Sequence, residues 1–323
     1  MDSRVGGEGR RARGVHSGFA LTLFRFRIAF SHVIGALFAS LRPKQWPKNL
    51  LVFAGLVFSR SLFNPAESLR SLGGFVAFCL LSGAVYLVND LADLERDRLH
   101  PQKRLRPIAS GRLKPGAAKV AAVVTAAVGM AGGFALDWRF GAVGLAYVVL
   151  ELAYSFRLKH LVVLDVMTVA AGFALRALAG TVLVHVTISS WLFVCSILLS
   201  LFISLAKRRH ELVFLEGGGA GHREVLESYS EGLLDQMMAV ATSSAVIAYS
   251  LYTIAPETVA KFGTHNLMLT VPFVLYGIYR YLYLVYRREM GGAPEKALLG
   301  DLPLLIDVLL WMGSVVAVIY LKT

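Results

Sequence analysis

The chain has 323 residues, of which 56% are hydrophobic and only 17% are charged, and its mean hydropathy is +0.61. A soluble domain carries roughly a quarter charged residues, so this composition excludes an ordinary soluble protein and predicts an integral membrane protein. The net charge of +12 does not indicate nucleic-acid binding, because the basic residues lie between apolar stretches and do not form one continuous basic face. Cys79 and Cys195 both lie within apolar runs and are interpreted as core residues, not as a disulfide or a metal site.

The first 41 residues differ from the rest of the chain. Residues 1–17 are basic and rich in glycine, which predicts a disordered cytoplasmic tail. Residues 18–41 are apolar with Arg25, Arg27 and His32 embedded, which predicts an amphipathic helix on the inner leaflet. We expect residues 42–323 to form a single all-α transmembrane domain.

Nine apolar stretches follow, each long enough to cross about 30 Å of hydrocarbon as a helix. They cover residues 47–63, 71–90, 116–135, 138–156, 161–182, 190–206, 236–255, 266–286 and 303–321. Connections after the odd-numbered stretches carry only five of the 33 bases, namely Arg60, Arg70, Arg139, Lys261 and Lys322. The positive-inside rule therefore predicts a multi-pass protein of the inner cell membrane, with its N-terminus and its charged motifs in the cytoplasm.

The most highly charged stretch begins where the second apolar stretch ends. It places Asp90, Asp93 and Asp97 at i, i+3 and i+7, within a narrow arc of one helix face. Clustered carboxylates repel one another unless cations lie among them, and Mg²⁺ binds one or two carboxylates together with phosphate oxygens. We expect these aspartates, with Asn89 assisting, to hold Mg²⁺ on a diphosphate. The alternative is a solvated helix end, but a carboxylate at the membrane boundary is costly and usually functional.

Basic and polar side chains are expected to bind the substrates. Lys103, Arg104 and Arg106 follow the aspartates and suit the charge of a diphosphate, although bases are also topology signals. The other candidates share a position at the expected cytoplasmic ends of the apolar stretches. They are Arg42, Lys44, Gln45, Lys48, Tyr154, Lys159, Lys207 and Arg208.

Two charged residues lie within the fifth apolar stretch. A carboxylate such as Asp165 costs free energy within an apolar stretch and needs a cation or a metal beside it. Lys159 is the nearest cation in the sequence. We expect Asp165 to contact a second metal or a substrate hydroxyl in preference to forming a structural ion pair. Arg176 lies about 16 Å further along the helix. At that depth Arg176 could form a structural pair with a buried group. Alternatively, it could lie near the lipid tail or the lipid phosphate.

The segment NDLADLERD resembles the NDxxDxxxD motif of the UbiA superfamily of intramembrane prenyltransferases, and YSFRLKHLVVLD is similar to its second motif region. The resemblance covers about residues 41–320. LRPKQWPKN, HPQKRLRPIASG and SLAKRRHEL look most like the decaprenyl-phosphate phosphoribosyltransferase branch. The usual second motif is DxxxD, whereas Val169 stands where its second aspartate is expected. That departure suits this branch, in which the motif is reduced.

The resemblance implies a Mg²⁺-dependent membrane enzyme. The donor would be 5-phosphoribosyl 1-diphosphate, the acceptor a polyprenyl phosphate, and the product a precursor of cell-wall arabinose donors. Catalytic roles would fall to Asp90, Asp93, Asp97 and Asp165, and homo-oligomerisation is left open. One alternative is prenyl transfer to an aromatic or tetrapyrrole acceptor. Another is a transporter or lipid-binding protein, whose charges would lie near the midplane on several helices and not at one face.

Overall fold

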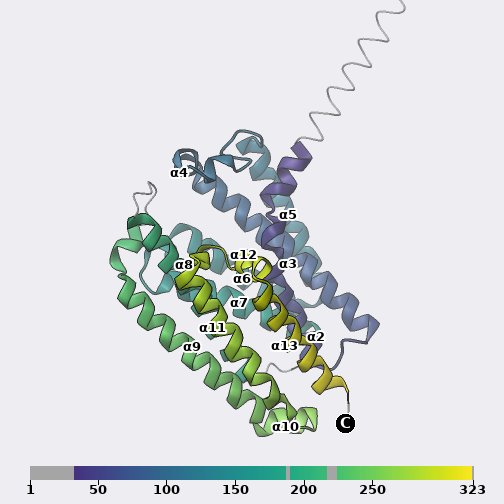
Figure 1. The fold of residues 1–323 in the computed structure, drawn as a ribbon. Coiled ribbons are helices and arrows are strands. Elements are labelled where there is room, and N and C mark those ends of the chain that lie inside the picture. Colours follow the sequence, from purple (N-terminus) through teal and green to yellow (C-terminus); the bar gives the residue numbers. More distant parts are fainter. Residues whose placement is uncertain (1–32, 187–189, 217–223, 322–323) are drawn as a thin grey trace, which may run out of the picture.

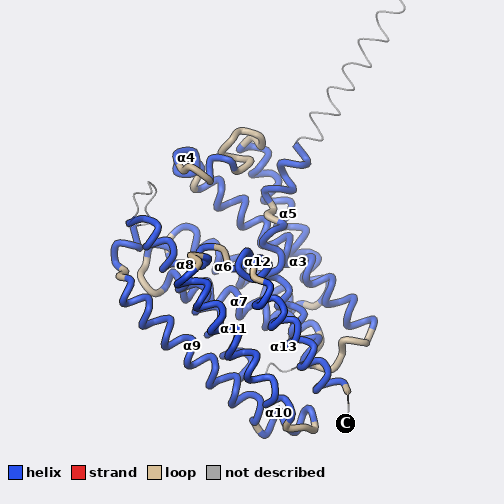
Figure 2. The backbone as a smooth tube through the Cα atoms, viewed as in Figure 1, coloured by secondary structure: helices blue, strands red, loops and turns tan. Residues whose placement is uncertain are grey.

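The computed structural model describes residues 33–186, 190–216 and 224–321. Over these ranges the chain is helical and contains no strand, which confirms the predicted all-α fold (Figure 2). Residues 33–40 are helical, in agreement with part of the expected interfacial helix, while the expected tail and residues 18–32 lie outside the described residues. In Figure 1, α4 (Leu94–Leu99) lies at one end of the molecule, and α10 (Pro256–Phe262) lies with the C-terminus at the other.

Seven helices in the described part of the chain are long and apolar enough to cross a membrane. They are α3 (Pro65–Ala92), α5 (Pro115–Leu136), α6 (Trp138–Phe156), α7 (Leu164–Leu183), α9 (Glu231–Ile254), η5 (Asn266–Thr270) continuing into α11 (Val271–Arg287), and α13 (Leu302–Tyr320). They coincide with seven of the expected stretches, so the chain is a multi-pass membrane protein. The expected stretch 190–206 lies within α8 (Ser190–Glu216), a helix of 27 residues. The predicted count of nine spans is not confirmed.

The first expected stretch, 47–63, is not a regular α-helix, and this part of the prediction is wrong. It is divided between η1 (Pro43–Phe53), an 11-residue 3₁₀ helix with Pro47 inside it, and α2 (Ala54–Phe58). Pro47 lacks the N–H donor that a continuous α-helix needs at that position. A 3₁₀ helix rises about 2.0 Å per residue, against about 1.5 Å for an α-helix. The eleven residues of η1 therefore span a greater length than eleven residues of an α-helix would.

Four of the long helices, α3, α6, α9 and α13, begin at polar capping residues in the connections. Asn64 caps α3 by accepting the backbone N–H of Ala66 at 3.0 Å, and Pro65 occupies the first helical position. Asp137, Ser230 and Asp301 cap α6, α9 and α13 in the same way. These caps satisfy amide donors that no preceding turn can bind, so each polar residue marks where a span starts.

Short elements join the long helices. After α3 come α4 and η2 (Lys103–Leu105), and η3 (Leu158–His160) links α6 to α7. The 3₁₀ helix η4 (Glu224–Ser228) precedes α9, while η6 (Met290–Gly292) and α12 (Pro294–Gly300) lie between α11 and α13. Helix α3 packs on α5 and α6, and each helix from α5 to α9 packs on the next.

Two glycines allow the backbones of η1 and α2 to lie directly on α7. A Cβ atom on Gly180 would lie 2.0 Å from the carbonyl oxygen of Val52, and one on Gly55 would lie 2.4 Å from the carbonyl oxygen of Gly180. Only hydrogen fits at both positions. This close crossing brings Asn49 of η1 beside Arg176 of α7, a contact that matters for the site described below.

Candidate functional site

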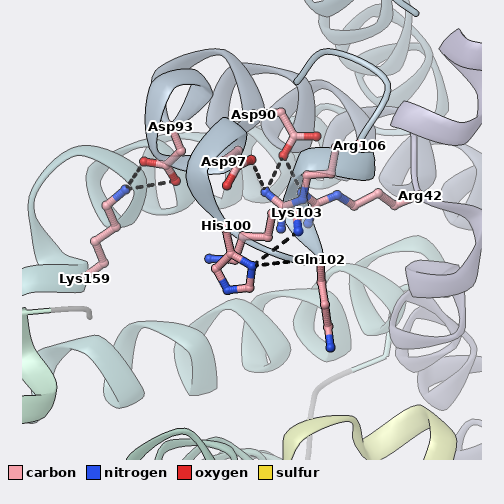
Figure 3. A network of polar contacts seen from close by, with 9 residues as sticks. All are labelled: Arg42, Asp90, Asp93, Asp97, His100, Gln102, Lys103, Arg106 and Lys159. Carbon is pink, nitrogen blue, oxygen red and sulfur yellow. Dashed lines mark hydrogen bonds and ion pairs between the residues drawn. The ribbon is translucent and has the colours of Figure 1, made fainter. Parts of the chain in front are cut away.

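Asp90 and Asp97 share one arginine at the end of the bundle that carries α4. Arg106 Nη1 lies 3.0 Å from Asp90 Oδ1 and 2.6 Å from Asp97 Oδ2 (Figure 3). Arg42 also donates to Asp90 Oδ1, and its guanidinium lies over the ring of Tyr86. Both carboxylates are buried, so these arginines supply the positive charge that makes their burial tolerable.

Asp93 points to a different base. Its carboxylate accepts hydrogen bonds from Lys159 Nζ at 3.0 and 3.4 Å, and Figure 3 shows it directed away from Arg106. The expectation of one uninterrupted aspartate-bearing helix is wrong, because α3 ends at Ala92 and α4 begins at Leu94. Backbone hydrogen bonds from Asp93 to Asn89 and from Asp97 to Asp93 still keep the helical spacing.

The connection after α4 is held by a histidine. His100 Nδ1 accepts the backbone N–H groups of Gln102 at 3.2 Å and Lys103 at 3.3 Å. Partial burial and the nearby charge of Lys103 lower the pKa of His100, which favours the neutral ring that can accept these bonds. The turn presents Arg106 to the aspartates, while Arg104 is exposed.

The expected metal ligands are suited to Mg²⁺ by their donor atoms. Three carboxylates and one amide oxygen form a hard donor set, and Asn89 Oδ1 is buried without a hydrogen-bond partner among the described residues. In the same part of the chain, no three His, Cys, Asp or Glu side chains lie close enough to hold a metal as they stand. The carboxylates are instead held by Arg42, Arg106 and Lys159.

Asp165 is fully buried and belongs to a second cluster. Its Oδ2 accepts from Arg208 Nε at 2.6 Å and its Oδ1 from the Tyr229 hydroxyl at 2.7 Å. Arg208 also donates to Glu211 at 2.6 Å and to the Tyr154 hydroxyl at 3.0 Å. Burial and the bond to Asp165 raise the pKa of Tyr229 to about 12, so Tyr229 stays a donor at neutral pH.

The predicted environment of Asp165 is thus corrected. Its cation is Arg208 and not Lys159, because Lys159 lies against Asp93. Asp165 lies in the first turn of α7, where the helix dipole also favours a carboxylate. Both of its oxygens are engaged by protein donors, so the structure favours the ion-pair alternative. A metal or substrate hydroxyl at Asp165 remains a prediction.

Arg176 lies in a third cluster, inside the bundle. It donates from Nε to Asn49 Oδ1 at 2.9 Å and from Nη2 to the Tyr147 hydroxyl at 2.7 Å. Asn49 in turn donates to Ser82 Oγ and Cys79 Sγ, each at 3.3 Å. Of the two expectations for Arg176, the geometry supports the structural pair, here with an amide and a phenol.

The remaining predicted residues lie around these clusters. Gln45 Nε2 donates to Glu295 of α12 at 3.1 Å and so connects η1 to the second half of the bundle. Lys44 and Lys207 are exposed, and Lys48 is half-buried. The structure therefore brings the aspartates, Arg42, Arg106 and Lys159 together, and it separates them from Asp165 and Arg208.

A family model settles the relationship. The model described as the UbiA prenyltransferase family matches residues 28–299. The chain belongs to the UbiA prenyltransferase family. This confirms the resemblance drawn from the aspartate motif.

Curated relatives cover nearly the whole of this UbiA family member. A decaprenyl-phosphate phosphoribosyltransferase of Corynebacterium glutamicum is 35% identical over 87% of this chain and 86% of that protein. A protein of the same name from Mycolicibacterium smegmatis is 33% identical over 90% of this chain and 94% of its own length. Among solved structures, a UbiA homologue from Archaeoglobus fulgidus, bound to GPP and Mg²⁺, is similar with a TM-score of 0.67. It is 18% identical, and the match covers 88% of this chain and 99% of that one, so it supports the fold.

Some residues in and around these clusters were missed by the sequence analysis. Tyr229 and Tyr86 carry no signal, because an aromatic residue at a span end is ordinary. Tyr147 lies in the interior of α6 and is equally inconspicuous. Glu151 is different: it stands inside the expected stretch 138–156, and a carboxylate there is a signal that could have found it.

Proposed function

We propose that this UbiA family member transfers the 5-phosphoribosyl group from 5-phosphoribosyl 1-diphosphate to a polyprenyl phosphate. The observation that carries the proposal is the arrangement at the aspartates. Three bases from separate segments, Arg42, Arg106 and Lys159, hold carboxylates of the family motif. The names of the curated relatives, at 33–35% identity over most of the chain, support the transfer of a phosphoribosyl group to a polyprenyl phosphate. In actinobacterial cells the product would feed arabinan synthesis for the cell wall.

The charges of the site suit a diphosphate leaving group. Asp90, Asp93, Asp97 and Asn89 Oδ1 would hold Mg²⁺, which supplies positive charge to the diphosphate as the bond to C1 of the ribose breaks. Arg106 and Lys159, which now neutralise those carboxylates, would then be free to bind the diphosphate oxygens.

The reaction needs little proton chemistry from the protein. An oxygen of the acceptor phosphate attacks C1, the bond from C1 to the diphosphate breaks, and the diphosphate leaves with the electron pair. A phosphate monoester has a second pKa of about 6 and is already ionised near neutral pH. Catalysis then rests on positioning and on electrostatic stabilisation of the departing charge.

The orientation follows from the charge pattern. The positive-inside rule puts the α4 end of the bundle in the cytoplasm, where a water-soluble sugar diphosphate is made. The lipid acceptor would lie in the surrounding bilayer, with its phosphate at the same end.

The direct test uses purified protein with labelled 5-phosphoribosyl 1-diphosphate, Mg²⁺ and a polyprenyl phosphate. We expect a labelled lipid, and we expect none from Asp90→Asn. The matched control is Glu95→Gln on α4, an exposed carboxylate that pairs only with Arg98 among the described residues and should leave turnover unchanged. The second candidate is prenyl transfer. A prenylated aromatic acceptor made from a prenyl diphosphate, with no phosphoribosylated lipid, would reject the proposed donor.

A further inference from the structure

A second group of charged side chains lies beyond the aspartates, and it includes the buried Arg176 and the half-buried Lys48. Lys48 of η1 interacts electrostatically with Glu151 of α6, Arg176 of α7, Lys207 of α8 and Glu295 of α12. Five separate elements thus contribute one charge each. Charges in a membrane-protein interior are costly and are usually paired or functional.

Most of this cluster is internally satisfied. Arg176 is only 4% exposed and is bound to Asn49 and Tyr147. The Tyr147 hydroxyl also forms a hydrogen bond with Glu151. Glu151 lies close to α7 as well, since a Cβ atom on Gly172 would lie 2.9 Å from its Oε1. Arg176, Tyr147 and Glu151 therefore form a rigid frame with defined partners.

Lys48 differs from the members of this frame. Within residues 33–186, 190–216 and 224–321, its ammonium has no hydrogen-bond partner and no ion pair, and Glu151 and Glu295 act on it from beyond ion-pair distance. Neither nearby carboxylate is free for Lys48, because Glu295 accepts a hydrogen bond from Gln45 and Glu151 is bound to Tyr147. An unpaired cation in a bundle interior is expensive, and an anionic ligand would relieve that cost.

We propose that Lys48 binds the phosphate monoester of the acceptor lipid and that Glu151 is a positioning residue which orients Lys48. This inference rests on the proposed function. Lys48 stands six residues beyond Arg42 along η1, about 12 Å further in by the rise of a 3₁₀ helix. The donor diphosphate occupies the aspartate end, so a phosphate that enters from the bilayer reaches Lys48 instead. A lysine serves as a point charge for phosphate and leaves the attacking oxygen free.

The same placement favours an anionic acceptor. A neutral aromatic acceptor would leave the Lys48 ammonium unpaired after binding, and a phosphate would not. Discrimination of this kind comes from the penalty on the wrong ligand as much as from attraction to the right one.

The test measures KM for each substrate separately. We expect Lys48→Met to raise the acceptor KM about ten-fold or more, which corresponds to the loss of one charge-assisted contact, and to leave the donor KM unchanged. Lys48→Arg should restore most of the acceptor affinity, and Lys48→Gln provides a second neutral variant. The control is Lys119→Met, an exposed lysine on α5.

Glu151 is tested through its dependence on Lys48. Glu151→Gln should raise the acceptor KM, and the double variant with Lys48→Met should be no worse than Lys48→Met alone. Glu257→Gln, an exposed carboxylate on α10, is the control. Additive effects in the double variant would refute the positioning role.

The remaining outcomes separate this inference from the proposed function. An unchanged acceptor KM in folded Lys48→Met, or a raised donor KM in its place, would overturn the assignment of Lys48 to the acceptor. Retained thermal protection by 5-phosphoribosyl 1-diphosphate with Mg²⁺ shows that each variant is folded. If the wild-type protein forms no phosphoribosylated lipid, the proposed function fails before Lys48 is tested.

Discussion

Lys159 Nζ lies 3.0 Å from Asp93 Oδ1 and thereby joins the connection after α6 to the junction of α3 and α4. The two residues are 66 positions apart in the chain. Lys159 is the more buried partner, with its side chain 12% exposed against 26% for Asp93. This contact places the Lys159 ammonium beside an aspartate of the family motif, where the donor diphosphate is expected to bind.

We expect Lys159→Met to raise the donor KM about ten-fold, because one charge-assisted phosphate contact is lost. Asp93→Asn should reduce kcat far more, since it removes an expected metal ligand. Steady-state assays with varied donor measure both effects, and Lys119→Met is the control for loss of a positive charge. A donor KM that is unchanged in Lys159→Met would contradict the role.

Asp165→Asn should destabilise the protein by about 1.5 to 3 kcal/mol, because buried Arg208 loses one of its two carboxylate partners and keeps only Glu211. The side chains of Arg208 and Asp165 are 4% and 0% exposed. Unfolding in detergent measures the change in the free energy of unfolding. Glu95→Gln, which breaks the exposed pair with Arg98, should cost less than about 1 kcal/mol. Equal effects of the two substitutions would show that Asp165 is not a structural partner.

Gly180→Ala should also destabilise the fold, by about 2 kcal/mol or more, because the added methyl group meets the backbone of η1. The carbonyl oxygen of Val52 lies 2.0 Å from the new Cβ and cannot move as a side chain would. Gly132→Ala on α5 is the matched control, since nothing lies within 4 Å of its Cβ. The melting temperature of the control should be equal to or above that of the wild type. A wild-type melting temperature in Gly180→Ala would disprove the close crossing.

Asp301 predicts a pH dependence of stability. The hydrogen bond from Arg280 lowers the pKa of Asp301 below its ordinary value of 3.8. A lowered pKa in the folded state adds stability above the unfolded pKa, and that stability is lost as the pH falls through the folded pKa. Asp301→Asn should therefore be less stable than the wild type at pH 7, and the difference should shrink once the pH falls below 3.8, the ordinary pKa of the aspartate. Thermal unfolding at pH 7 and pH 3 tests this, and a difference as large at pH 3 as at pH 7 would rule out the charge as its source.

Local chemistry in the sequence was enough to predict the class of the molecule. Long apolar runs cannot remain in water, so the membrane class and seven of the spans could be located from composition. The order of residues from Asn89 to Asp97 was enough to identify the family motif. Backbone hydrogen bonds across the break at Asp93 keep the helical spacing of its aspartates. Pro47 was the sequence signal that the first expected span would not be a regular α-helix.

The partners of the charged residues could not be predicted in the same way. Lys159 is only six positions from Asp165 yet binds Asp93, and Arg208 reaches Asp165 across 43 positions. Proximity along the chain decides little inside a helical bundle, because neighbouring helices place distant residues within hydrogen-bond reach.

The sequence by itself determined that the protein lies in a membrane, that it is helical, and that carboxylates and bases meet at one end of it. Those properties follow from side-chain solubility and helical periodicity, which act over a few turns. Only the tertiary structure decided which base neutralises which acid, and that Lys48 stands unpaired beside Glu151 and Arg176 among the described residues. The physical reason is that packed helices place distant residues within contact distance. The glycine crossing of η1 and α7, which brings Asn49 beside Arg176, is one example.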